Sequence, residues 1–276
     1  VDFNRPMVAI NQWEQAADSM YTLCGKDRIH PSTDGHLVMA YLFLKAQGLA
    51  GKPVADIRID GAGKKVTRSD NCRVSDLSIS SDNLTFTYEA KSLPYPIDTS
   101  YYDNEKHTQA DALSVIPFMD EMNYEGLSVS GLSDGYYGLT IGGEFIGRFT
   151  ARELERGINM ALLQNTPQYK QAMKIRQMNE ERWLKERKMR EFYWVEYNLM
   201  RKTGMLWACD EAAVDTLRKY RPHDIFLQWN GDLWLHYMHK GIREDCVNEQ
   251  QDLVDRIYEQ NKPIPLRIEI KKFTDL

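Results

Sequence analysis

The sequence predicts an α/β fold made of three successive parts. Residues 1–50 combine predicted helices with one short strand, and residues 51–149 alternate apolar and polar side chains. Residues 150–276 carry apolar side chains at helical spacing instead. Alternation with a period of two is typical of strands, and recurrence every three or four residues is typical of helices. We therefore expect an α/β segment, then a small antiparallel β-sandwich module, then a mainly α-helical region.

The composition is that of an ordinary globular protein and excludes some classes of partner. The 276 residues are 42% hydrophobic and 27% charged, with a formal net charge of -5. A nucleic-acid-binding domain is usually strongly basic, so we predict no nucleic-acid partner. No apolar run approaches the ~20 residues of a membrane span. Because the chain starts at Val1 and shows no signal peptide, we expect it to be the C-terminal part of a longer protein.

The first 50 residues contain two predicted helices separated by a polar loop. Pro6 fits the first turn of a helix that runs to about Met20. Residues 21–24 have strand character, and the polar loop 25–33 follows. A second helix is expected from about Asp34 to Gln47, and its apolar residues on nearly all sides indicate that it is buried.

The middle part has the signals of short strands joined by tight turns. Alternation is clearest at residues 55–60, 84–88, 127–129 and 137–141. Asp60-Gly61 and Gly142-Gly143 are hairpin signals, because glycine and aspartate accept the backbone angles of two-residue turns.

The last part begins with a capping box, Thr150 to Glu153, which opens a helix to about Leu163. Further helices are expected at about residues 168–202, 210–220, 229–241 and 244–260, and a last strand at residues 266–270. Cys209 and Cys246 would form a disulfide if their helices packed together, but we favour buried free thiols for both.

Asp27 and His30 are the candidate catalytic residues. A serine hydroxyl needs a base with a pKa near neutrality to remove its proton, and histidine is the usual base. A carboxylate that accepts the second ring N–H holds the base in one tautomer. Asp-x-x-His on a tight loop can provide both groups, and Pro31 restrains His30 to an extended conformation. By spacing alone, the pattern favours an ordinary surface loop with an Asp N-cap and an exposed histidine.

The residues around this pair resemble the last conserved block of the SGNH (GDSL-type) hydrolases. The block comprises Val1-Asp2-Phe3-Asn4, Pro6-Met7, Asp27-Arg28-Ile29-His30-Pro31, Gly35-His36 and Met39-Ala40-Tyr41. Residues 132–141, 153–159 and 165–168 are in turn similar to the C-terminal region of bacterial GDSL-like lipase/acylhydrolase proteins. The resemblance implies that residues 1–50 are the C-terminal part of a three-layer α/β/α domain, in which Asp27 and His30 belong to a Ser-Asp-His triad.

The nucleophile that the resemblance requires is absent from the sequence. SGNH enzymes carry their serine in a Gly-Asp-Ser motif that precedes the Asp-x-x-His block, and no Gly-Asp-Ser occurs here. The resemblance therefore implies that the full-length protein is a serine esterase without metal or organic cofactor, and that this chain alone is inactive. Its implied substrate is a small ester or an acylated carbohydrate, and its implied location is secreted or periplasmic.

A second hypothesis gives this chain no catalysis of its own. Residues 51–276 would then be a carbohydrate-binding or scaffolding appendage. Aromatic side chains suit sugar rings, and five tyrosines are candidates for such a surface, although the 15 tyrosines spread through the chain favour ordinary core and loop positions. They are Tyr95, Tyr101, Tyr102, Tyr136 and Tyr137.

Two further patterns are predicted to be structural. Gly131-Leu132-Ser133-Asp134-Gly135 matches the G-x-S-x-G of a nucleophile elbow, but that motif needs a strand before it and a helix after it. Strands are expected on both sides here, so we predict a hairpin turn. His236 and His239, with Asp232 one turn earlier, could line one face of a helix as metal ligands. The neighbouring tryptophans favour a packing helix, and we predict no metal site.

Overall fold

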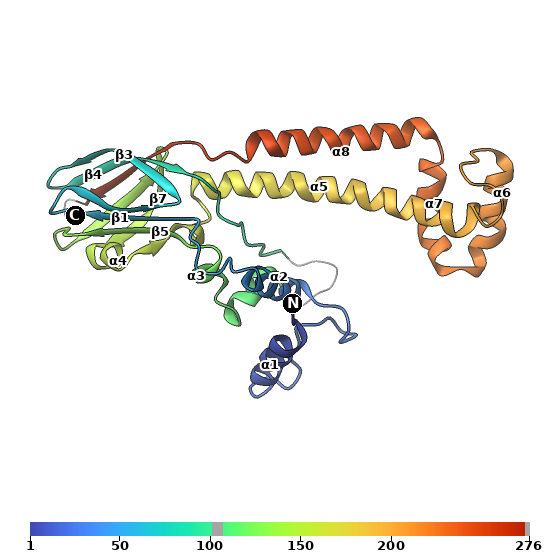
Figure 1. Ribbon diagram of the computed structural model, residues 1–276, viewed down its shortest axis with the longest axis horizontal. Helices are drawn as coiled ribbons and strands as arrows, with labels where there is room; N and C mark the ends of the chain where they lie inside the picture. Colours follow the sequence, from blue (N-terminus) through green and yellow to red (C-terminus); the bar gives the residue numbers. More distant parts are fainter. Residues whose placement is uncertain (101–106, 274–276) are drawn as a thin grey trace. The chain divides into compact units, whose positions relative to one another are not determined.

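The computed structural model describes residues 1–100 and 107–273, so Tyr101 and Tyr102 lie outside the described residues. The protein is a mixed α/β structure with two β-sheets and a helical C-terminal region (Figure 1). It divides into two compact units. The first unit comprises residues 1–173 and 262–276, and the second comprises residues 174–261.

The two sheets belong to the first unit. The four-stranded sheet has the order β2-β1-β5-β8, and the five-stranded sheet has the order β3-β4-β9-β6-β7. The strands are β1 (Ala55–Asp60), β2 (Lys65–Asp70), β3 (Cys72–Ile79), β4 (Asn83–Ala90), β5 (Glu125–Ser130), β6 (Tyr136–Ile141), β7 (Glu144–Thr150), β8 (Ile158–Asn159) and β9 (Leu266–Lys272).

The core of this part lies between the sheets, because alternate residues of each strand face inward. In β4, Leu84, Phe86 and Tyr88 are buried, and the two threonines between them are less so. They share one hydrophobic cluster with residues of β1 and β5 from the other sheet. The expected alternation therefore produces a sandwich.

The sandwich differs from the prediction in two pairings. Strands β1 and β5 are parallel, with Ile57 opposite Leu127, so the module is not purely antiparallel. Strand β9 lies between β4 and β6 and pairs antiparallel with both. The sequence pattern located β9 but gave no sign of its neighbours, which lie more than 100 residues earlier.

Gly142 and Gly143 form the predicted two-residue turn between β6 and β7. Both have positive φ, +59° and +85°, as a tight hairpin turn requires. The connection from β5 to β6, which contains Ser133, is a different case. It joins strands of two different sheets, so the prediction of a hairpin turn there is wrong.

Residues 1–50 contain helices and no strand. Helix α1 (Asn4–Glu14) and helix α2 (Thr33–Ala46) are connected by a loop in which Cys24 and Pro31 form an isolated β-bridge. The strand expected at residues 21–24 is therefore reduced to one bridge. All these residues are described, and no part of a three-layer α/β/α domain's sheet is present among them.

Helix α2 packs on a segment that follows much later in the chain. Its residues Leu37, Val38 and Tyr41 share a buried cluster with Ile116 and Phe118. The segment consists of the 3-10 helix η1 (Gln109–Ser114) and helix α3 (Phe118–Glu121). The remaining short helices of this unit are α4 (Ala151–Arg156) and the 3-10 helix η2 (Met160–Leu162).

The second unit is built from long helices. Helix α5 (Pro167–Val195) enters it and continues as a π-helical segment, Glu196–Met200. Then follow α6 (Glu211–Tyr220), the 3-10 helix η4 (Arg221–His223), α7 (Ile225–Tyr237) and α8 (Lys240–Gln260).

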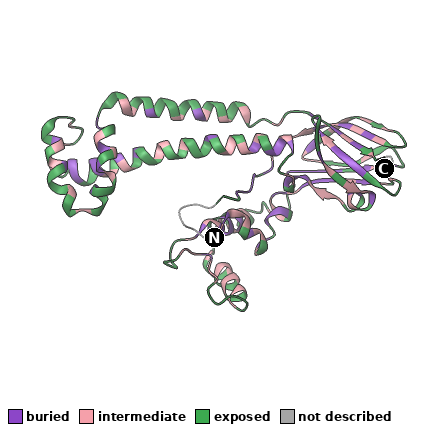
Figure 2. Ribbon diagram, turned by 180° about the vertical axis from the view of Figure 1, so that it is seen from behind, coloured by how far each residue is buried: buried purple, intermediate pink, exposed green. Residues whose placement is uncertain are grey.

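Helices α5 and α8 run side by side, and Lys185 of α5 forms an ion pair with Glu249 of α8, 2.6 Å between Nζ and Oε2 (Figures 1 and 2). Most of their length is exposed, and the buried core of the unit lies where α6 and α7 pack on the end of α5 (Figure 2). None of the described helices is long and apolar enough to cross a membrane.

Candidate active site

Asp27 and His30 form a hydrogen-bonded pair. The Asp27 Oδ2 atom lies 2.6 Å from His30 Nδ1. A carboxylate can only accept, so Nδ1 donates its proton, and the Nε2 atom of the neutral ring is left as an acceptor. This is the tautomer that a histidine needs to remove a proton from a nucleophile.

The second oxygen of the Asp27 carboxylate is held by the backbone. Asp27 Oδ1 accepts the N–H groups of Ile29 and His30, at 2.9 and 3.1 Å. The hydrogen bond from His30 and these two backbone hydrogen bonds favour the charged form and lower the pKa of Asp27 to about 2. Asp27 is therefore ionised at neutral pH and keeps His30 in one orientation.

The loop that carries the pair has an unusual backbone. Arg28, between the two residues, has a φ of +57°, which residues other than glycine rarely adopt. Hydrogen bonds from Gly25 N–H to the His30 carbonyl (2.8 Å) and from Arg28 N–H to the Gly25 carbonyl (2.9 Å) fix this conformation. Strained residues of this kind persist where the surrounding structure over-determines them, often at functional sites.

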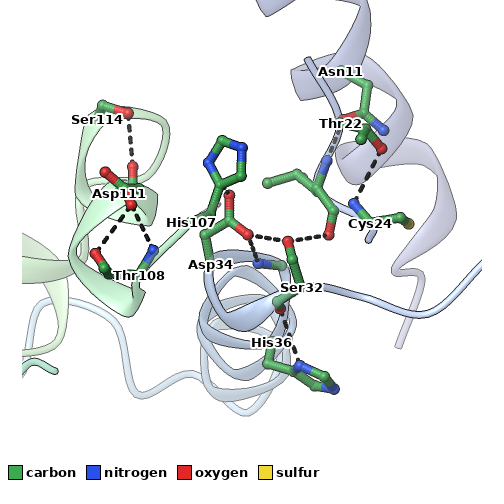
Figure 3. A network of polar contacts seen from close by, with 12 residues as sticks. Asn11, Thr22, Cys24, Ser32, Asp34, His36, His107, Thr108, Asp111 and Ser114 are labelled. Atoms are coloured by element: carbon green, nitrogen blue, oxygen red, sulfur yellow. Dashed lines mark hydrogen bonds and ion pairs between the residues drawn. The ribbon is translucent and has the colours of Figure 1, made fainter. Parts of the chain in front are cut away.

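A buried polar network anchors the end of the loop on helix α2 (Figure 3). The Ser32 hydroxyl contacts both the Leu23 carbonyl, at 3.0 Å, and the Asp34 carboxylate. Asp34, which is 1% exposed, also accepts the Gly35 N–H at 2.8 Å and pairs with His107 Nδ1 at 3.5 Å. The network thus connects the loop of Asp27 and His30, called the dyad loop below, to helix α2. It also connects this loop to His107, which lies just before the 3-10 helix η1.

The Asp27–His30 pair is open to solvent. The side chain of His30 is 84% exposed and that of Asp27 is 48% exposed. In the described part of the chain, no serine or cysteine side chain forms a hydrogen bond with His30, whose ring bonds to Asp27. Asp27 and His30 thus have the geometry that a base and its orienting carboxylate require.

The other candidate residues have structural partners. Ser133 accepts a hydrogen bond from Lys272 Nζ at 2.7 Å and contacts the Tyr137 hydroxyl at 3.2 Å, with strands on both sides. Asp232 accepts two hydrogen bonds from Arg221, at 2.6 and 2.7 Å, so its carboxylate is engaged away from His236 and His239. Among the described residues no three potential ligands are grouped to hold a metal ion.

Cys209 and Cys246, the two cysteines considered for a disulfide, are free thiols. Cys209 is exposed, and Cys246 is buried beside the Lys185 carbonyl.

One cavity was not predicted from the sequence. It has a volume of about 610 Å³ and lies beside α2, in the size range of small-molecule sites. His36 and Leu37 line it from the start of α2, and Tyr95, Phe118 and Asn123 line it from two later segments. Because the walls come from separate stretches of sequence, no local pattern could have indicated it.

Two comparisons find similarity to proteins whose descriptions name diltiazem. Residues 173–262 match the family model described as the diltiazem deacetylase C-terminal helical domain. A solved structure described as a gut microbial diltiazem-metabolizing enzyme is 42% identical, with a TM-score of 0.93. The chain shares the fold of that enzyme. The similarity covers 99% of this chain and 62% of the solved one, and no curated protein matches.

These findings correct the expected family. The resemblance to SGNH hydrolases rested mainly on residues 1–48, whereas the similarity to the diltiazem-metabolizing enzyme extends over 99% of the chain. Both matches carry a diltiazem description and neither is described as an SGNH or GDSL protein, so the SGNH recognition is overturned. The helical match coincides with the second compact unit, residues 174–261.

Proposed function

We propose that this chain is part of an ester hydrolase that removes a small acyl group, such as acetyl, from a small molecule. The observation that carries the proposal is the 2.6 Å hydrogen bond between Asp27 Oδ2 and His30 Nδ1, which leaves Nε2 free to accept a proton. The similarity to a diltiazem-metabolizing enzyme and to a deacetylase domain supports the reaction class.

In the proposed mechanism, His30 Nε2 removes the proton of a serine hydroxyl, which attacks the ester carbonyl. Asp27 stabilises the imidazolium ion that forms. His30 then gives the proton to the leaving alcohol, and water repeats the sequence on the acyl-enzyme. The serine in this proposal is contributed by a part of the protein outside residues 1–276, and no metal or organic cofactor takes part.

The cavity beside α2 is the proposed site for the apolar part of the ester. Helix α2 begins two residues after Pro31, and the cavity residue His36 lies in its first turn. Leu37, Leu44 and Phe118 offer apolar contact there.

The test compares variants of the full-length protein with p-nitrophenyl acetate as substrate. His30→Ala removes the base, and we expect kcat/KM to fall by about 10⁴-fold or more. Asp27→Asn leaves a group of the same shape but favours the wrong tautomer, and we expect a loss of similar order. His223→Ala, which changes an exposed histidine of the second unit, serves as the control. Turnover of His30→Ala near that of the control would refute the proposal.

A further inference from the structure

A second candidate site lies in the helical unit and depends on the backbone of Trp207. This residue has a φ of +65°, in the left-handed region, and is 44% exposed. Bulky residues seldom adopt this conformation, whereas glycine does so without steric cost. A tryptophan here is costly for the backbone and also leaves a large aromatic ring in contact with water.

A buried glutamate, Glu196, holds the backbone of Trp207 in place. Glu196 is 1% exposed and begins the π-helical segment that follows α5. Its Oε2 atom accepts the Trp207 backbone N–H at 3.0 Å, and its Oε1 atom accepts Trp234 Nε1–H at 2.8 Å. Single π-helical turns occur frequently at functional sites. A buried carboxylate is thus used to fix one surface tryptophan.

Two tyrosines extend the aromatic surface around Trp207. The ring centroids of Tyr193 and Tyr197 lie 6.1 and 6.0 Å from that of Trp207, each at an interplanar angle of 85°. The tyrosines are 38% and 46% exposed. The Arg243 guanidinium lies over the Trp207 ring, 5.9 Å from its centroid. The three rings therefore form a partly exposed aromatic cluster in which both tyrosines meet the indole edge to face.

The aromatic cluster borders a shallow pocket of about 380 Å³ whose other wall comes from α8 and includes the apolar Val247 beside polar side chains. Tyr193 and Trp207 contribute the aromatic wall, and Lys240, Glu244 and Asn248 are the polar groups that α8 contributes. Lys240 pairs with Glu244 at 3.2 Å, and the Asn248 amide forms no side-chain hydrogen bond within the described residues. The pocket thus offers hydrogen-bond donors and acceptors beside an aromatic face.

We propose that this pocket binds carbohydrate. The apolar C–H face of a pyranose ring stacks on the Trp207 indole, and its hydroxyl groups exchange hydrogen bonds with Glu244 and Asn248. An aromatic wall with a few polar groups is the usual make-up of a small-molecule site. The presence of Lys240 and Glu244 argues against a protein partner, because lysine and glutamate are depleted in the cores of protein–protein interfaces. This site is independent of the Asp27–His30 pair.

The test uses fluorine NMR on residues 1–276 labelled with 5-fluorotryptophan. The six tryptophans give six resonances, and Trp207→Phe identifies that of Trp207. Cellohexaose, xylohexaose and maltohexaose are titrated separately to millimolar concentration. We expect at least one of them to shift the Trp207 resonance saturably and to leave that of buried Trp234 unchanged.

Two variants decide the interpretation. Trp207→Ala should abolish binding, measured by calorimetry, while the Trp234 resonance and the helical circular dichroism show that the unit is still folded. Trp229→Ala removes another exposed tryptophan, 67% exposed on α7, and should leave binding unchanged. The proposal is overturned if no hexaose shifts Trp207, or if Trp207→Ala binds as well as the unchanged protein. Self-association that Trp207→Ala abolishes, without sugar binding, would overturn it in favour of an interface between two copies.

Discussion

Gly35 packs directly against the carbonyl of Leu23. A Cβ atom built on Gly35 would lie 2.0 Å from the Leu23 carbonyl oxygen, closer than any real contact. That oxygen also accepts hydrogen bonds from the backbone N–H and the hydroxyl of Ser32. The start of helix α2 therefore approaches the dyad loop as closely as it does only because residue 35 has no side chain.

Gly35→Ala should therefore loosen the loop that holds Asp27 and His30. The added methyl group must push the Leu23 carbonyl away, and overpacking of this kind typically costs about 1–3 kcal/mol. Urea denaturation would measure the loss. Gly25→Ala is a matched control in the same loop, because its Cβ would lie 3.7 Å from the His30 carbonyl, an ordinary contact distance. Equal stability of the two variants would contradict the role assigned to Gly35.

Asp34 should contribute to stability through the groups that it accepts. Asp34→Ala leaves the Gly35 N–H and the Ser32 hydroxyl without this buried acceptor, which costs about 1–3 kcal/mol. Asp34→Asn keeps one oxygen acceptor and should cost less. The difference in the free energy of unfolding, measured with urea for both variants, checks this. A larger loss for Asp34→Asn than for Asp34→Ala would contradict the network described around Asp34.

Asp27 should titrate near pH 2. Because its folded pKa is lowered, the carboxylate stabilises the folded loop above the ordinary aspartate range, and this contribution disappears as the pH falls through about 2. Carbon NMR of the side-chain carboxyl group would follow the titration. In His30→Ala the pKa should rise towards the ordinary value, since the hydrogen bond from His30 is the largest cause. An unchanged pKa in that variant would show that the two side chains do not interact in solution.

Glu125 should make the first unit more stable at low pH. It is completely buried between the sheets, accepts hydrogen bonds from Tyr88 (2.8 Å) and Gln168 (3.2 Å), and burial raises its pKa to about 7. Between the ordinary glutamate pKa and 7, the folded protein keeps a proton that the unfolded chain has released. Stability should therefore fall as the pH rises through this window, by about 3 kcal/mol in all at 1.36 kcal/mol per pKa unit.

Glu125→Gln isolates this effect. The amide has nearly the same shape and cannot ionise, so the variant should be more stable than the unchanged protein at pH 8 and should lack the fall between pH 5 and 8. Urea denaturation at both values measures the difference. Tyr88→Phe, which removes one hydrogen bond to the carboxylate, should raise the pKa of Glu125 further and extend the fall to higher pH. An identical pH dependence in Glu125→Gln and the unchanged protein would exclude Glu125 as its source.

The local elements of this protein were determined by its sequence. Asp27 and His30 are three residues apart on a short loop, so their hydrogen bond depends on nearby backbone alone, although their catalytic role stays a prediction. The Gly142-Gly143 turn and the long helices of the second unit follow from the same short-range rules. The resemblance of residues 1–48 to the SGNH hydrolases, however, predicted the wrong family.

Only the tertiary structure decided which distant segments meet. The pairing of β9 with β4 and β6, the parallel contact of β1 with β5, and the burial of Glu125 join residues far apart in sequence. The periodicity of a strand fixes which side chains share a face, but it carries no information about the neighbouring strand. Gly35 and Trp207 show the same limit, since one is needed for a contact twelve residues away and the other is held by a buried glutamate.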